Sequence, residues 1–157
     1  MNFWEKLSLN PAYCGFEGAF LDMLHIKKSY LHIRFCCEGD LYEKYQDDLR
    51  HEYLDPVEHE LLVDTVFLSP AILQAESHMP ESIRFGDVYL VSSLTKDPGG
   101  VYSLRFYTHE GEQYCLKFTF RECIAKPYAE MDCSFYYNHP ELFDKPFSLK
   151  EFMGRKV

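Results

Sequence analysis

The residue types most able to carry chemistry in this chain are six cysteines, seven histidines and a dense run of carboxylates. A zinc site usually takes its ligands in close pairs, such as two cysteines separated by two residues. Cys36 and Cys37 are adjacent, Cys123 and Cys133 are ten apart, and no second histidine follows His51 at helical spacing. The spacing therefore predicts no metal site. It predicts instead that the cysteines are reduced and pack as small apolar side chains.

No motif for a known reaction accompanies these residues. The two glycine clusters, 14–18 and 97–100, match neither a phosphate-binding loop nor a dinucleotide fingerprint. The nucleophile elbow G-x-S-x-G is also missing. The dense run of carboxylates at 38–64 is compatible with a pair that acts in general acid–base catalysis. Acids on an exposed helix, however, are usually solvated. We therefore expect a protein that is not an enzyme and needs no cofactor.

Residues 38–64 hold almost all of the net charge. They contain ten acidic and two basic residues, a formal charge of −8, whereas the whole chain carries −9. Such a local excess speeds the encounter with a basic partner and disfavours other partners. Tyrosine rings in the same run suit the anchors of a protein interface. The predicted partner-binding residues are Glu43, Asp47, Asp48, Glu52, Asp55, Glu58, Tyr42 and Tyr53.

The acidic run has a second interpretation, a solvated helix face with no partner. The charge balance disfavours nucleic-acid binding, because that function needs a basic surface for the phosphates. No apolar run approaches the roughly 20 residues of a membrane span, and the N-terminus lacks the apolar core of a signal peptide. The sequence thus predicts a cytoplasmic protein.

Alternation of polar and apolar residues predicts the strands that position these side chains. Residues 20–37 indicate two antiparallel strands joined by a tight turn, and 61–68 indicate a buried strand. The second half is typical of a meander, with strands at 88–94, 101–107 and 113–121 and a last strand at 133–137.

The sequence predicts one longer helix, in the acidic run, and several short helices elsewhere. Asp40 and Glu43 have the spacing of a capping box, and apolar or aromatic residues recur every four positions up to Tyr53, which predicts a helix over 40–54. Short helices are predicted at 3–7 with Asn2 as the cap, at 71–75 after Ser69-Pro70, and from Ser148 to Gly154.

These elements define the predicted fold class. A chain of 157 residues that is 46% apolar and 17% aromatic can bury one substantial core. We expect a single α+β domain over residues 1–157. It would be an antiparallel β-sheet meander of about five to seven strands, with one longer acidic helix packed on it and short terminal helices.

The chain resembles, in its general profile, the immunity proteins that bacteria co-produce with secreted toxins. The likeness rests on Trp4, on Phe20-Leu21-Asp22 at the start of the first hairpin, on the meander 101–121 and on the acidic run. It implies a non-enzymatic binding module that neutralises a basic toxin, such as a nuclease, through the acidic surface at 38–64. Two other classes stay open. One is a small-ligand binder or hydrolase with a site in a sheet cavity, and the other is a subunit that self-associates through an apolar strand edge.

Overall fold

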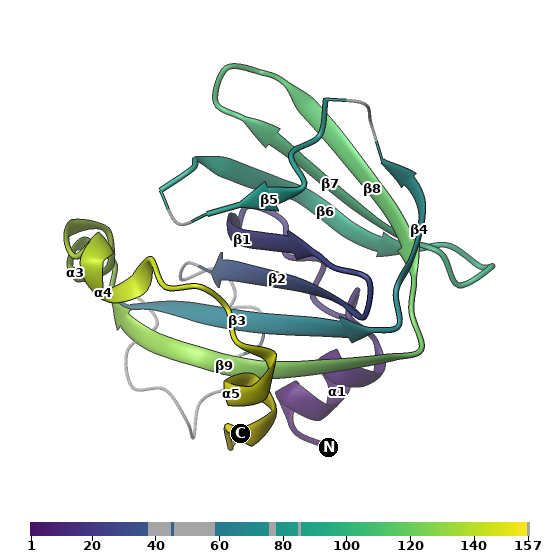
Figure 1. Ribbon diagram of the computed structural model, residues 1–157, viewed down its shortest axis with the longest axis horizontal. Coiled ribbons are helices and arrows are strands. Elements are labelled where there is room, and N and C mark those ends of the chain that lie inside the picture. Colours follow the sequence, from purple (N-terminus) through teal and green to yellow (C-terminus); the bar gives the residue numbers. More distant parts are fainter. Residues whose placement is uncertain (38–44, 46–58, 76–77, 85, 157) are drawn as a thin grey trace.

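The computed structural model describes residues 1–37, 45, 59–75, 78–84 and 86–156. Within these residues one sheet contains the strands β1 (Phe20–Ile26), β2 (Tyr30–Cys37), β3 (His59–Leu68), β4 (Ala71–Ala75), β5 (Ser82–Ile83), β6 (Tyr89–Lys96), β7 (Tyr102–Thr108), β8 (Gln113–Thr119) and β9 (Glu122–Asp132). The helices are α1 (Phe3–Leu9), α3 (Cys133–Asn138), α4 (Pro140–Phe143) and α5 (Leu149–Gly154). The architecture is therefore mostly antiparallel sheet with a few short helices (Figure 1).

Two long bent strands close the sheet on itself. β3 continues into β4, and β8 continues into β9, each across a two-residue corner. β3 pairs with β9, and β4 pairs with β8. Both pairings are antiparallel, and together they run from His59 opposite Asp132 to Ala75 opposite Leu116. Because β3 also pairs with β2 and β8 also pairs with β7, the strand order β4-β8-β7-β6-β1-β2-β3-β9 returns to its start. Figure 1 shows the two resulting halves, with β1, β2, β3 and β9 below β6, β7 and β8.

The corner between β3 and β4 corrects one prediction. Residues 71–75 form strand β4, so the short helix predicted after Ser69-Pro70 is wrong. Ser69 adopts a left-handed backbone conformation with φ of 50°, and its amide donates to the Ser29 carbonyl at 3.1 Å. This turn directs the chain into the ladder with β8, and that long-range pairing outweighs the local helix signal.

The inner face of the sheet holds the main core. The alternation predicted for 20–37 and 101–121 places one apolar face inside, and α1 adds its aromatic side chains to the same core. Its largest buried members are Phe3, Trp4, Phe35, Phe67, Phe106 and Phe118. Asn2 caps α1 as predicted, since its side chain accepts a hydrogen bond from the Glu5 amide at 2.9 Å.

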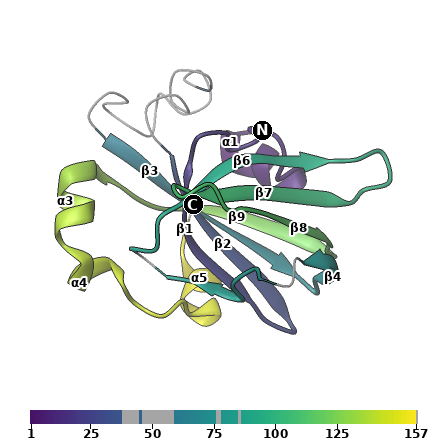
Figure 2. The same cartoon turned by 90° about the horizontal axis from the view of Figure 1, so that it is seen from above.

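Helices α3, α4 and α5, with the chain between them, cover the outer face of the sheet. Figures 1 and 2 place this segment and α1 on opposite sides of β3 and β9. The predicted helix from Ser148 to Gly154 is confirmed as α5, and the Ser148 hydroxyl accepts from the Glu151 amide at 3.2 Å. The strand predicted at 133–137 is wrong because these residues form α3, directly after the long strand β9.

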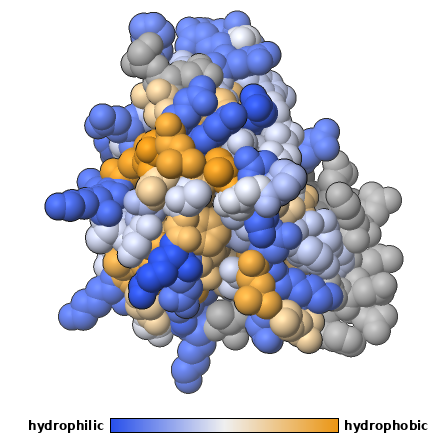
Figure 3. Space-filling model, turned by 90° about the vertical axis from the view of Figure 1, so that its right-hand side faces the viewer, coloured by the Kyte–Doolittle hydropathy of each residue, from blue (hydrophilic) through white to orange (hydrophobic). Residues whose placement is uncertain are grey.

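In the part of the chain that the structure describes, the sheet has nine strands, more than the predicted five to seven or so. The predicted helix over 40–54 lies outside the described residues apart from Tyr45. None of the described helices has both the length and the apolar character needed to cross a membrane. Figure 3 shows hydrophobic side chains gathered on the side where β4 lies, and β4 exposes Ile72 and Leu73 there. β4 is an end strand of the sheet order and pairs with β8.

Candidate functional site

The residues predicted to bind a partner lie in two parts of the chain that the structure leaves undescribed, 38–44 and 46–58. The residues concerned are Glu43, Asp47, Asp48, Glu52, Asp55, Glu58, Tyr42 and Tyr53.

The described residues fix where this part of the chain is attached. Residues 38–58, named here the acidic segment, leave the sheet at Cys37 and return at His59, and β2 and β3 are paired neighbours with Cys37 opposite Leu61. Tyr45, in the middle of the segment, donates a hydrogen bond from its hydroxyl to the Tyr13 carbonyl at 3.0 Å. Its ring also lies 5.7 Å from that of Phe3. The acidic segment is thus held to the body at both ends and at Tyr45.

Burial has a measurable consequence at Tyr45. Removal from solvent raises the pKa of its hydroxyl to about 12. The neutral phenol therefore persists through the physiological range and keeps its hydrogen bond to Tyr13. Tyr45, the one described residue of the predicted stripe, packs against the main core.

Two acids of the 38–64 run do not belong to any acidic surface. Glu60 is 5% exposed and Asp64 is fully buried, because both lie on β3 at positions that face the outer layer beneath the C-terminal helices. The sequence interpretation of 38–64 as one acidic surface is therefore corrected for these two residues. The acidic segment 38–58 retains eight acidic and two basic residues, a formal charge of −6.

Asp64 instead organises a buried charged cluster. Its Oδ1 accepts hydrogen bonds from His32 Nε2 and from Arg34 Nε, both at 2.8 Å. Its Oδ2 accepts from an Nη of Arg34 at 3.2 Å and from an Nη of Arg155 at 3.0 Å. One carboxylate is thus shared by two guanidiniums and an imidazole, and these four residues are named here the Asp64 cluster.

The protonation states follow from this geometry. Burial alone would raise the pKa of Asp64, but the hydrogen bond from His32 and the charge of Arg34 outweigh it and hold that pKa below its usual value. Burial lowers the pKa of His32 to about 4, against the opposing effect of Asp64. At neutral pH the cluster therefore combines an ionised carboxylate, a neutral imidazole that donates from Nε2, and two cationic guanidiniums.

Aromatic rings enclose the cluster on the side of the C-terminal segment. The ring of Phe147 stacks on His32 with centroids 3.6 Å apart, and the guanidinium of Arg34 lies 3.6 Å from the ring centre of Tyr128. Arg155 lies 5.4 Å from the same Tyr128 ring. Stacked guanidiniums keep a fixed plane, so the cluster presents its charges in defined directions.

A second group, centred on the buried Cys36 and Glu60, lies further along the same face. The thiol of Cys36 donates to Glu60 Oε2 at 2.6 Å, and the Tyr137 hydroxyl donates to Cys36 Sγ at 3.8 Å. Burial, followed by the neighbouring Asp22 charge, raises the pKa of Cys36 far above its usual value. A thiol that stays protonated is a poor nucleophile, so this group favours a structural role.

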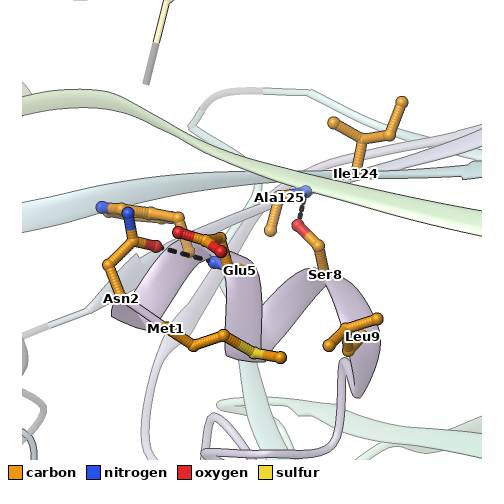
Figure 4. A pocket seen from close by; sticks show the side chains of 8 residues that line it. Met1, Asn2, Glu5, Ser8, Leu9, Ile124 and Ala125 are labelled. Atoms are coloured by element: carbon orange, nitrogen blue, oxygen red, sulfur yellow. Dashed lines mark hydrogen bonds between the residues drawn. The ribbon is translucent and has the colours of Figure 1, made fainter.

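Two hollows adjoin these elements. One, of about 140 Å³, lies between Tyr128 and the C-terminal segment and reaches Arg34 and Arg155. The other is an apolar groove of about 460 Å³ between α1 and β9 (Figure 4). In that groove the Ser8 hydroxyl accepts a hydrogen bond from the Ala125 amide at 2.9 Å, so α1 covers a backbone donor of β9.

Metal binding finds no support in the residues that the structure describes. Among them, no group of three or more His, Cys, Asp or Glu side chains is arranged to hold an ion. The described cysteines Cys14, Cys36, Cys37, Cys115 and Cys123 are free and buried, in agreement with the prediction of reduced core thiols.

Part of the Asp64 cluster was detectable in the sequence. His32 and Arg34 occupy the polar positions of a predicted strand, and Asp64 interrupts an apolar one, so a buried partner for that acid could have been sought there. Arg155 is 91 positions from Asp64 in the sequence, and it occupies no predicted strand position that would mark it as a partner of that acid. Comparison with protein-family models, with curated proteins and with solved structures found no match to this chain.

Proposed function

We propose that this protein is a non-enzymatic binding module that engages a basic protein through the acidic segment, and that it serves as an immunity protein against a basic toxin. The observation that carries the proposal is the charge of this segment, −6 within residues 38–58 of a chain whose total is −9. A focused negative charge accelerates encounter with a cationic surface and disfavours neutral or acidic competitors.

The attachment of the acidic segment supports the proposal. Cys37 and His59 lie on the paired strands β2 and β3, and Tyr45 donates a hydrogen bond to the Tyr13 carbonyl. Fixed attachment points of this kind lower the ordering cost of binding. The proposed electrostatic contacts are Glu43, Asp47, Asp48, Glu52, Asp55 and Glu58, and the proposed anchors are Tyr42 and Tyr53.

The test begins with capture of the partner. The tagged protein is incubated with an extract of its native host and with the product of any adjacent toxin gene, and bound proteins are eluted with a salt step. The proposal expects a basic protein in the high-salt eluate, whose toxic activity is abolished on mixing with this chain. A captured protein that keeps its full activity in the complex would contradict the immunity function.

A matched pair of variants then locates the interface. Asp47→Lys with Asp48→Lys changes the net charge from −9 to −5, and so does Glu81→Lys with Glu110→Lys, whose side chains are exposed elsewhere on the molecule. We expect the first pair to weaken binding about tenfold or more and the second pair to weaken it less than about threefold. Equal affinities for the two variants would exclude the acidic segment as the interface.

A further inference from the structure

The hollow between Tyr128 and the C-terminal segment is lined by an unusual set of charges for so acidic a protein. Three cationic side chains, Arg34, Lys145 and Arg155, line it together with one acidic side chain, Glu151. The carboxylate of Asp64 lies directly behind, but it is shared by both guanidiniums. The wall of this hollow, named here the Arg155 pocket, therefore carries a net positive charge.

Arg155 supplies a donor that faces no acceptor among the described residues. Its Nε is buried and has no hydrogen-bond partner there, whereas one of its Nη atoms is bound to Asp64. A buried N–H without an acceptor costs about 1–3 kcal/mol. An oxygen atom of a bound group would remove this cost, and a negatively charged oxygen would do so most effectively.

The guanidinium of Arg155 is already oriented for such a ligand. Its ion pair with Asp64 fixes one edge, and its Cζ lies 5.4 Å from the ring centre of Tyr128 and 5.0 Å from that of Phe152. Side chains held in this way lose little freedom on binding, so more of the interaction energy appears as affinity. Lys145 is exposed at the rim and adds charge without a fixed geometry.

The size of the Arg155 pocket limits the ligand. A volume of about 140 Å³ holds several water molecules, and hence a group of a few heavy atoms rather than a nucleotide or a peptide. We infer that the Arg155 pocket binds a small oxyanion, a phosphate or a carboxylate group, through Arg155 with support from Lys145. This inference does not depend on the acidic segment.

The most direct test observes the Arg155 Nε–H signal in nitrogen-15 spectra of the intact protein. Sodium phosphate and sodium acetate are titrated in separate arms, with sodium chloride added to keep the ionic strength constant. We expect a saturable shift of the Arg155 signal in at least one arm, with little shift of Arg105, which is exposed on β7. The arm with the tighter binding identifies the anion class. A response that chloride reproduces equally would overturn the inference.

Variants establish that the pocket is the site. Arg155→Lys retains the charge but loses Nε, and we expect about tenfold weaker binding. Lys145→Gln should weaken binding about threefold, whereas Lys150→Gln, with the same charge change on an exposed residue outside the pocket, should leave it within about 1.5-fold. If Arg155→Lys fails to fold, the comparison of Lys145→Gln with Lys150→Gln still tests the site. Equal anion affinities in these two variants would contradict the proposed pocket.

Discussion

Asp64 is the residue on which the buried charges of this protein depend. It is fully buried and accepts hydrogen bonds from His32, Arg34 and Arg155. Removing one partner of a buried pair is costly, because the remaining charge stays desolvated. Its neighbours Arg34 and His32 are themselves buried and cannot turn to solvent without a local rearrangement.

Asp64→Asn is therefore expected to lower the free energy of unfolding by about 3 kcal/mol, measured by urea denaturation near pH 7. Asp144→Asn is the matched control. It breaks an ion pair with Arg84 in which the two side chains are 35% and 69% exposed, and it should cost less than about 1 kcal/mol. Similar losses in the two variants would show that the Asp64 cluster contributes no more than a surface pair.

Acid should destabilise the protein through His32. Burial lowers its folded pKa to about 4, whereas an unfolded histidine titrates near 6.5. Between these values the unfolded chain binds a proton that the folded chain does not, so the free energy of unfolding falls as the pH drops from about 6.5 to about 4. The expected loss is on the order of 2–3 kcal/mol. Asp64, whose pKa is lowered on folding, adds a further loss as the pH falls below about 4.

Urea denaturation at several pH values checks this expectation. His32→Gln keeps a donor for Asp64 but does not titrate, and it should flatten most of the pH dependence in that window. His25, whose pKa burial also lowers, supplies a smaller part of the same slope. His109→Gln, in the exposed β7–β8 loop, should leave the slope unchanged. A wild-type stability that is equal near pH 7 and near pH 4.5 would contradict the assignment.

At the scale of elements, the C-terminal segment depends on one lysine of β9. Lys126 is buried, and its Nζ donates to the carbonyls of Phe152 and Arg155, both at 2.8 Å, at the end of α5. Carbonyls at a helix C-terminus lack partners within the helix, so a cation there stabilises it. This contact and the Arg155–Asp64 pair hold α5 against the sheet.

Lys126→Met is expected to increase the hydrogen exchange of the α5 amides at least about tenfold, because the helix end loses its donor. Lys150→Met, an exposed position on α5 itself, should change the exchange less than about twofold. Exchange rates for α5 that are the same in both variants would show that α5 is held by other contacts.

The sequence was a good guide to elements whose signals are local. The hairpins at 20–37 and 101–121 and the capped helices at both ends follow from alternation, turn residues and cap residues, and all of these are confirmed. The prediction was wrong at 71–75 and at 133–137, where long-range pairing and the end of β9 decide the structure. A single sequence carries no direct signal for a strand that changes partners at a corner.

At the scale of the whole molecule, the structure separates two kinds of charge. The cationic residues Arg34, Lys126 and Arg155 meet Asp64 and helix carbonyls beneath the C-terminal segment, where they form a buried layer. The net negative charge lies mostly in the acidic segment, between two paired strands. The charge count of the sequence could not separate the buried Glu60 and Asp64 from the other acids of 38–64.

The central claim, that the acidic segment recruits a basic partner, is tested most directly by the association rate constant of the captured partner as a function of salt. For the wild-type chain we expect this rate constant to fall about tenfold or more between about 50 and 500 mM sodium chloride. Asp47→Lys with Asp48→Lys should lower the low-salt rate constant and flatten the salt dependence, whereas Glu81→Lys with Glu110→Lys should do much less. Wild-type rate constants and salt dependence that persist in the Asp47/Asp48 variant would contradict the account.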